Sequence, residues 1–105
     1  MDEFQRALLE AADEALLQLS ESVRHSIYWY LKNRYGLARE EVPFKPEEFA
    51  RGLRSLFGEG ADMILEWVAR GLYAKLGLPF EERPDWGFMD YVSHAKESAR
   101  RSPAP

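Results

Sequence analysis

The chain has 105 residues, a net charge of −4 and no cysteine, with 46% hydrophobic and 30% charged residues. This length suits one domain with its own hydrophobic core, and the composition is typical of a soluble globular protein. The lack of cysteine excludes disulfides, thiolate zinc sites and cysteine nucleophiles, and the charge balance excludes a strongly basic nucleic-acid-binding protein.

The N-terminal residues, MDEFQ, are acidic, whereas a signal peptide begins with basic residues. The longest run of large apolar side chains covers residues 27–31, far fewer than the roughly 20 residues that a membrane-spanning helix needs. We therefore expect a cytoplasmic protein that makes no membrane contact. We expect a single domain over residues 1–105, with a frayed tail at 102–105.

The first expected helix covers residues 2–19, where apolar side chains recur at helical spacing in two neighbouring stripes. One stripe contains Phe4, Leu8, Ala11 and Ala15, and the other contains Leu9, Ala12, Leu16 and Leu19. Both stripes fit a helix that packs against two others in the core. Alternatively, the second stripe continues as a heptad seam and pairs with a second copy of the chain.

Residues 22–37, SVRHSIYWYLKNRYGL, predict the central helix of the fold, because five large side chains follow one another without a break. A helix that is apolar all round is usually touched by neighbours on every side. Ser20 or Ser22 can cap its start, although one long bent helix with the preceding segment stays an alternative. Gly36 can end it in the left-handed conformation, with Leu37 folding back on Leu31.

The remaining segments predict three more helices joined by loops. Pro43 breaks the helical pattern in the preceding loop, and Pro46 begins the first of these helices, with an expected buried stripe of Phe49, Leu53, Leu56 and Phe57. A sharp turn at Gly58 and Gly60 leads to a helix over residues 61–76. The last helix is expected over residues 86–100, with Asp85 as its cap. The fold class is therefore all-α, a single compact bundle of about five helices.

Aromatic residues make up 13% of the chain, more than one small core readily buries, and exposed aromatic side chains often mark interfaces. Tyr28 and Trp29 do not fit the core face of their helix. We expect them to be covered by the last helix, through Phe88 or Tyr91, or by a partner chain, or else to line a ligand site. With Met63 and Trp67, which share a helix face, they form the candidate interface. The expected partner is a second copy, giving a dimer, or another protein.

Residues that could carry chemistry are sparse. His94 lies one turn from Asp90 and from Glu97, a spacing that could hold a metal ion, but the second histidine that makes such motifs specific is missing. A solvated, salt-bridged helix face is the favoured interpretation. We expect no enzyme, no cofactor and no metal. A basic helix face with Arg51 and Arg54 supports nucleic-acid binding as the alternative function.

Three motifs follow one another in residues 20–80: an aromatic helix ending in Tyr-Gly-Leu, a Pro-Glu-Glu-Phe helix start, and Phe-Gly-x-Gly-Ala. In this order they resemble the NitrOD family, the Nitrosopumilus output domains of the fifth type. That resemblance implies a small all-helical archaeal module, of the kind found at the C-terminal end of signalling proteins. It implies a non-enzymatic output or interaction role and transfers no catalytic residue. Because only the first expected helix precedes the matching segment in this sequence, we expect a stand-alone module in place of the family's multidomain pattern.

Overall fold

The chain folds into α-helices joined by loops and turns, and the all-α prediction is confirmed. The computed structural model describes residues 1–101, in which no strand occurs. The helices are α1 (Glu3–Leu17), α2 (Glu21–Tyr35), α3 (Pro46–Phe57), α4 (Ala61–Leu76) and α5 (Phe88–Arg101). None of the helices in this described part is long and apolar enough to cross a membrane. The tail predicted to fray, residues 102–105, lies outside the described residues.

The first two helices are separate because each has its own N-terminal cap. At the start of α1, the Gln5 amide donates a 2.8 Å hydrogen bond to Oδ1 of Asp2, and the Asp2 amide donates to Oε1 of Gln5 at 2.9 Å. At the start of α2, the Val23 amide donates to the hydroxyl oxygen of Ser20 at 3.0 Å. Of the two predicted caps, Ser20 is therefore the one used, and the alternative of a continuous helix is wrong.

Two glycines end helices as the sequence predicts. Gly36 has φ 66° at the end of α2, and Gly77 has φ 69° at the end of α4, a left-handed conformation that costs glycine little. The Leu37 amide donates to the Leu31 carbonyl at 3.2 Å, which completes the predicted Schellman cap. Leu37 is buried, so the cap also anchors the chain that leaves α2.

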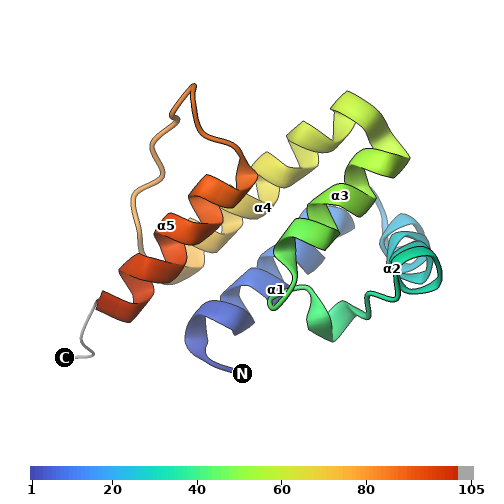
Figure 1. Cartoon of the computed structure of the whole chain (residues 1–105), viewed down its shortest axis with the longest axis horizontal. Coiled ribbons are helices and arrows are strands. Elements are labelled where there is room, and N and C mark those ends of the chain that lie inside the picture. The colour runs from blue at the N-terminus through green and yellow to red at the C-terminus, as the bar shows by residue number, and fades with distance from the viewer. Residues whose placement is uncertain (102–105) are drawn as a thin grey trace.

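The connections around α3 follow the predictions closely. The loop before it holds one 3-10 turn, η1 (Arg39–Glu41), and α3 begins at Pro46 as expected. A second 3-10 turn, η2 (Gly58–Gly60), reverses the chain sharply into α4 (Figure 1).

The predicted start of α5 is wrong by two residues. Asp85 does not cap the helix, which begins at Phe88. The Trp86 amide instead closes a turn by donating to the Arg83 carbonyl at 3.0 Å, and the Gly87 amide donates to Oδ2 of Asp90 at 2.8 Å. Asp90, in the first turn, therefore accepts from the amide of the residue just before the helix.

The centre of the core is the pair α1 and α4, which pack along each other over most of their length. They run in opposite directions, with α3 and α5 beside them, whereas α2 is seen almost end-on (Figure 1). Seven of the eight apolar residues in the two predicted stripes are buried. The exception is Leu19, which follows the end of α1. The interpretation that both stripes pack within the chain's own core is therefore confirmed. A seam formed by the second stripe with another copy would need side chains that the core already holds.

The prediction that α2 is the central helix is wrong. Only Ile27 and Leu31 of α2 are buried, and Val23 is 37% exposed. Successive residues on a helix point about 100° apart, so the aromatic run spreads around α2 instead of facing one core. Tyr28 turns toward α1, Tyr30 toward α3, and Trp29 is 65% exposed.

Candidate functional site

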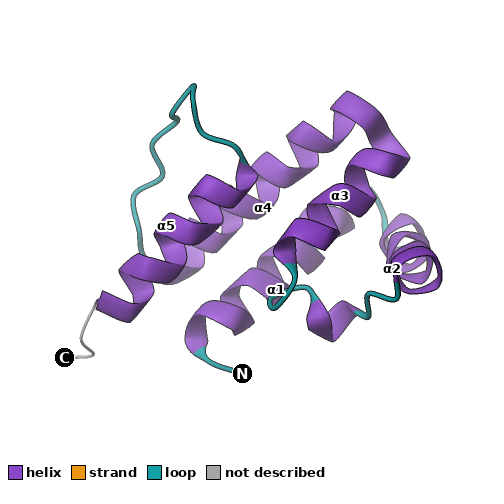
Figure 2. Cartoon of the chain, viewed as in Figure 1, coloured by secondary structure: helices purple, strands orange, loops and turns teal. Residues whose placement is uncertain are grey.

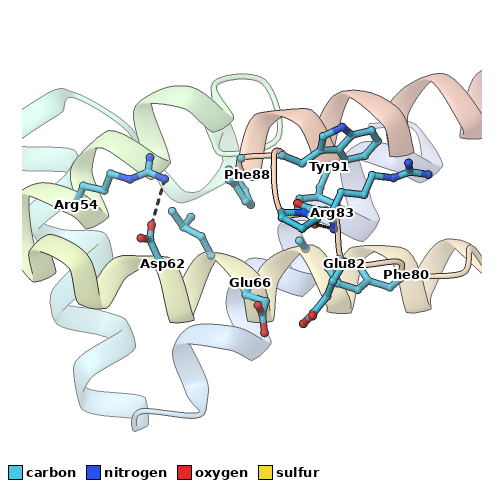
Figure 3. A pocket seen from close by; sticks show the side chains of 13 residues that line it. Arg54, Asp62, Glu66, Phe80, Glu82, Arg83, Phe88 and Tyr91 are labelled. Carbon is cyan, nitrogen blue, oxygen red and sulfur yellow. Dashed lines mark hydrogen bonds and ion pairs between the residues drawn. The ribbon is translucent and has the colours of Figure 1, made fainter.

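A groove of about 520 Å³ lies over α4, and we call it the α4–α5 groove. Leu65, Ala69 and Phe88 are among its apolar residues. Figure 3 shows Arg54 and Asp62 at one end, Phe88 in the middle, and Arg83 and Tyr91 at the other end. The described residues that line it include no histidine, serine or lysine.

The charged residues around the α4–α5 groove are paired with one another. Arg54 contacts Asp62 at 3.4 Å, and Arg70 reaches Glu66 at 3.2 Å and Glu82 at 2.6 Å. These groups are about half exposed or more, so their pairs contribute little stability. Their mutual pairing leaves the groove without a dominant sign of charge that would select a ligand.

A cluster of aromatic rings holds the long connection between α4 and α5, which is the longest non-helical stretch in the described chain (Figure 2). The Tyr91 ring stacks on Phe80 at 5.0 Å and meets Trp86 edge-on at 5.1 Å. The Arg83 amide donates to the Tyr91 hydroxyl at 2.8 Å. Several of the surplus aromatic residues are therefore structural, since they fasten this connection to α5.

Tyr73 anchors the same cluster from α4. Its hydroxyl donates to the Tyr91 carbonyl at 2.8 Å, and its ring meets Phe80 at 5.3 Å. Burial, together with the nearby Tyr91, raises the pKa of Tyr73 to about 12. The phenol therefore stays protonated and keeps its hydrogen bond at neutral pH.

His94 packs among aromatic side chains. No group of three or more His, Asp or Glu residues suited to a metal ion occurs within residues 1–101. The His94 ring instead stacks near Tyr73 at 6.2 Å and lies 5.5 Å from Trp86. The favoured interpretation was a salt-bridged face, and Glu97 does pair with Arg101, at 2.6 Å.

Tyr28 is covered from within the chain, but not by α5 as predicted. Its hydroxyl donates a 2.6 Å hydrogen bond to Oδ1 of Asp13 on α1. Nε of Arg39, in η1, donates to the same oxygen at 3.0 Å, and a second guanidinium nitrogen pairs with Oδ2. Tyr28 thus belongs to a junction of α1, α2 and η1. We therefore no longer count it among the candidate interface residues.

The electrostatics of this junction favour an ionised carboxylate. Burial acts to raise the pKa of Asp13, but the hydrogen bonds from Arg39 and Tyr28 outweigh it and hold that pKa below its ordinary value. Burial and the bond to Asp13 raise the pKa of Tyr28 well above the usual range. Both shifts fix one protonation state, with a neutral phenol donating to a charged acceptor.

The other three candidate interface residues do not form one surface with Tyr28. Trp29 lies on the outer side of α2, and Met63 is 55% exposed on α4. Trp67 is partly buried and packs against the core. The i,i+4 pair on α4 is therefore half core and half surface.

A second hollow, the α2–α3 groove, has a volume of about 230 Å³ and an apolar lining. Its residues are Ser22, Val23, Ser26, Ile27, Tyr30, Leu56 and Phe57. The predicted burial of Leu56 and Phe57 is wrong, because they are 40% and 38% exposed. The two helices approach closely at Gly52, and Tyr30 and Ser55 are joined by a 3.1 Å hydrogen bond between their hydroxyls. The groove lies toward the C-terminal end of α3, and all of the described residues that line it come from α2 and α3.

The predicted basic face is split by the structure. Arg54 turns to Asp62 and lines the α4–α5 groove, whereas Arg51 is exposed and makes no ion pair with any described residue. Sequence spacing places both residues on the outside of α3. It does not reveal that an acid on the next helix draws one of them away.

The α2–α3 groove was missed by sequence reasoning because each of its apolar residues fits a helical core stripe. The one available signal was the surplus of large apolar residues near the helix ends.

A comparison of the chain with protein-family models, with curated proteins and with solved structures finds no match. Candidate functional residues therefore come from geometry alone.

Proposed function

We propose that this protein is a non-enzymatic interaction module that binds another polypeptide through the α2–α3 groove. The observation that carries the proposal is the exposure of Val23, Leu56 and Phe57 beside one another in an apolar hollow. Apolar side chains gathered on a monomer surface often mark protein contacts. The larger α4–α5 groove is a weaker candidate, because self-paired charges surround it.

The resemblance to the output-domain family adds a context to this proposal. An archaeal output module in signal transduction would act by contacting a further protein, in the cytoplasm. That context rests on the motifs in residues 20–80 and on composition. The nucleic-acid alternative receives less support, because Arg54 is paired with an acid and the α2–α3 groove is lined by apolar side chains.

The proposal can be tested by selecting peptides that bind the chain from a displayed random library. The enriched peptides are then measured against wild type and against the Phe57→Asp variant, with Phe44→Asp as the control. Phe44 is exposed in the turn before α3 and does not line the groove. We expect the groove variant to weaken binding at least about tenfold, as for a central interface residue, and the control to have little effect.

Sedimentation at micromolar concentration tests whether the bound polypeptide is a second copy. Self-association that Phe57→Asp abolishes would support the groove as a homodimer contact. A strict monomer together with a library that yields no groove-dependent peptide would overturn the proposal. Circular dichroism of both variants checks that each keeps its helices.

A further inference from the structure

Four helix ends come together at one end of the molecule. Because α1 and α4 run in opposite directions, the end of α1 lies toward the start of α4. Short turns join the end of α1 to the start of α2, and the end of α3 to the start of α4, and both turns lie on the right in Figure 1. We call this part of the molecule the apolar end, after six exposed side chains that it carries: Leu17, Leu19, Val23, Leu56, Phe57 and Met63.

The apolar end holds most of the exposed large hydrophobic side chains of the protein. Nine such side chains occur within residues 1–101, and six of them lie at this end. Each of the six is between 37% and 55% exposed. Together they expose on the order of 500 Å², which is close to the apolar share of the roughly 800 Å² that each partner buries in a standard protein interface.

The lengths of the connections explain why this end is uncovered. The turns at residues 18–20 and 58–60 are too short to fold back over the helix ends that they join. The other two connections, residues 36–45 and 77–87, are longer and supply their own apolar cover. Leu37 and Val42 are each 1% exposed, and Phe80 packs against the core. The chain therefore leaves the apolar end open to a second molecule.

We propose that two copies of this chain associate through their apolar ends. This inference rests on the proposed function, because the α2–α3 groove forms part of the apolar end, and it names a second copy as the polypeptide that binds there. In a two-fold dimer the same surface serves both copies, so that surface has to complement itself. The apolar end meets this requirement, since Met63, a protruding and adaptable side chain, lies at the same end as a hollow of about 230 Å³.

The charges at the apolar end do not oppose this association. None of the described residues that line the α2–α3 groove is charged. The charged residues around the apolar end are of both signs: Glu21, Arg24, Arg54, Glu59 and Asp62. Arg54 and Asp62 are paired with each other within the chain. The contact between the copies is therefore apolar, and added salt should not weaken it.

Sedimentation velocity of the whole chain over roughly 1–100 µM tests this inference. Wild type should form a dimer with a dissociation constant in the micromolar range, as small interfaces often do. Phe57→Asp changes a residue of the groove, and Met63→Glu changes an exposed residue that lines neither groove. Each should weaken the dimer at least about tenfold.

Phe44→Asp is the matched control for both variants. Phe44 is 56% exposed, as Met63 is to a similar degree, but it lies in the turn before α3 and not at the apolar end. This variant should leave the dimer unchanged. Circular dichroism of all three variants checks that each keeps its helices.

The outcomes separate this inference from the proposed function. A wild-type chain that stays monomeric, while a library peptide still binds the groove, would overturn the dimer and leave the proposed function standing. A monomer that also binds no groove-dependent peptide would contradict both. A dimer that Phe57→Asp disrupts and Met63→Glu does not would confine the contact to the groove and overturn the wider surface.

Three further results would overturn the inference outright. A dimer that resists both variants would form through another surface. A dimer that dissociates as salt is raised would be held by charge. Assembly beyond two copies would contradict a two-fold contact, because each copy has one apolar end and two copies close it.

Discussion

The Tyr28 hydroxyl donates a 2.6 Å hydrogen bond to Oδ1 of Asp13, and this bond joins α2 to α1. Because Arg39 contacts the same carboxylate, one acidic side chain connects three consecutive elements of the chain. Asp13 is largely covered, with 14% of its side chain exposed. A hydrogen bond to a charged and partly desolvated acceptor is stronger than one between neutral groups at the surface.

Replacing Tyr28 with Phe should lower the free energy of unfolding by about 1–2 kcal/mol, because a hydrogen bond to a covered carboxylate is lost while the ring remains. Urea denaturation followed by circular dichroism measures the change. Tyr30→Phe is the matched control, since the bond of Tyr30 to Ser55 is exposed and between neutral hydroxyls. Equal losses in the two variants would show that the carboxylate adds nothing to the bond.

The stability that Asp13 contributes to the folded chain should be lost at acid pH. Its pKa in the folded chain lies below the ordinary value, so the unfolded chain takes up a proton first as the pH falls. The stabilisation is present above about pH 4 and is lost as the pH falls through the lowered pKa. Asp13→Asn should lower stability at neutral pH and flatten the acid limb of the stability curve. Asp62→Asn, which removes the acid of an exposed ion pair, is the control variant.

Features that depend on neighbouring residues were predictable from the sequence. The Gly36 cap, the Pro46 helix start and the limits of α4 follow from backbone preferences that act over a few residues. The stripes of α1 were also correctly assigned to the core. In each case the local pattern and the final packing favour the same arrangement.

Features that depend on distant side chains were not predictable. The run Tyr28-Trp29-Tyr30 is apolar by composition, but two of its hydroxyls have partners 15 and 25 residues away in the chain. The choice between core and surface for Leu56 depends on whether a third helix covers the end of α3. Helical periodicity carries no information on that point, so the α2–α3 groove emerges only from the structure.

Tyr91→Phe should loosen the connection between α4 and α5 with little effect on global stability. The ring keeps its stacking on Phe80, but the Arg83 amide loses the hydroxyl acceptor 2.8 Å away. Hydrogen exchange at the Arg83 amide should become faster, while the free energy of unfolding falls by about 1 kcal/mol or less. Unchanged exchange at Arg83 would indicate that the aromatic stacking alone holds the connection.

Gly52→Ala tests the close approach of α2 and α3 beside the groove. A Cβ at Gly52 would lie 2.2 Å from Cδ2 of Leu31, which is fully buried and has little room to move. Overpacking typically costs about 1–3 kcal/mol, whereas alanine in a helix gains about 1 kcal/mol over glycine. We therefore expect a net destabilisation of about 1 kcal/mol, measured by urea denaturation.

Gly71→Ala is the matched control, because its Cβ would meet Ala11 at 3.3 Å, a contact that a small shift relieves. There the gain in helix propensity should offset the crowding and leave stability within about 0.5 kcal/mol of wild type. The groove lies on the same helix pair, so Gly52→Ala should also weaken the binding of groove peptides, whereas Gly71→Ala should not. If Gly52→Ala stabilised the chain as an ordinary helix substitution does, α2 and α3 would have to be more loosely packed than this geometry requires.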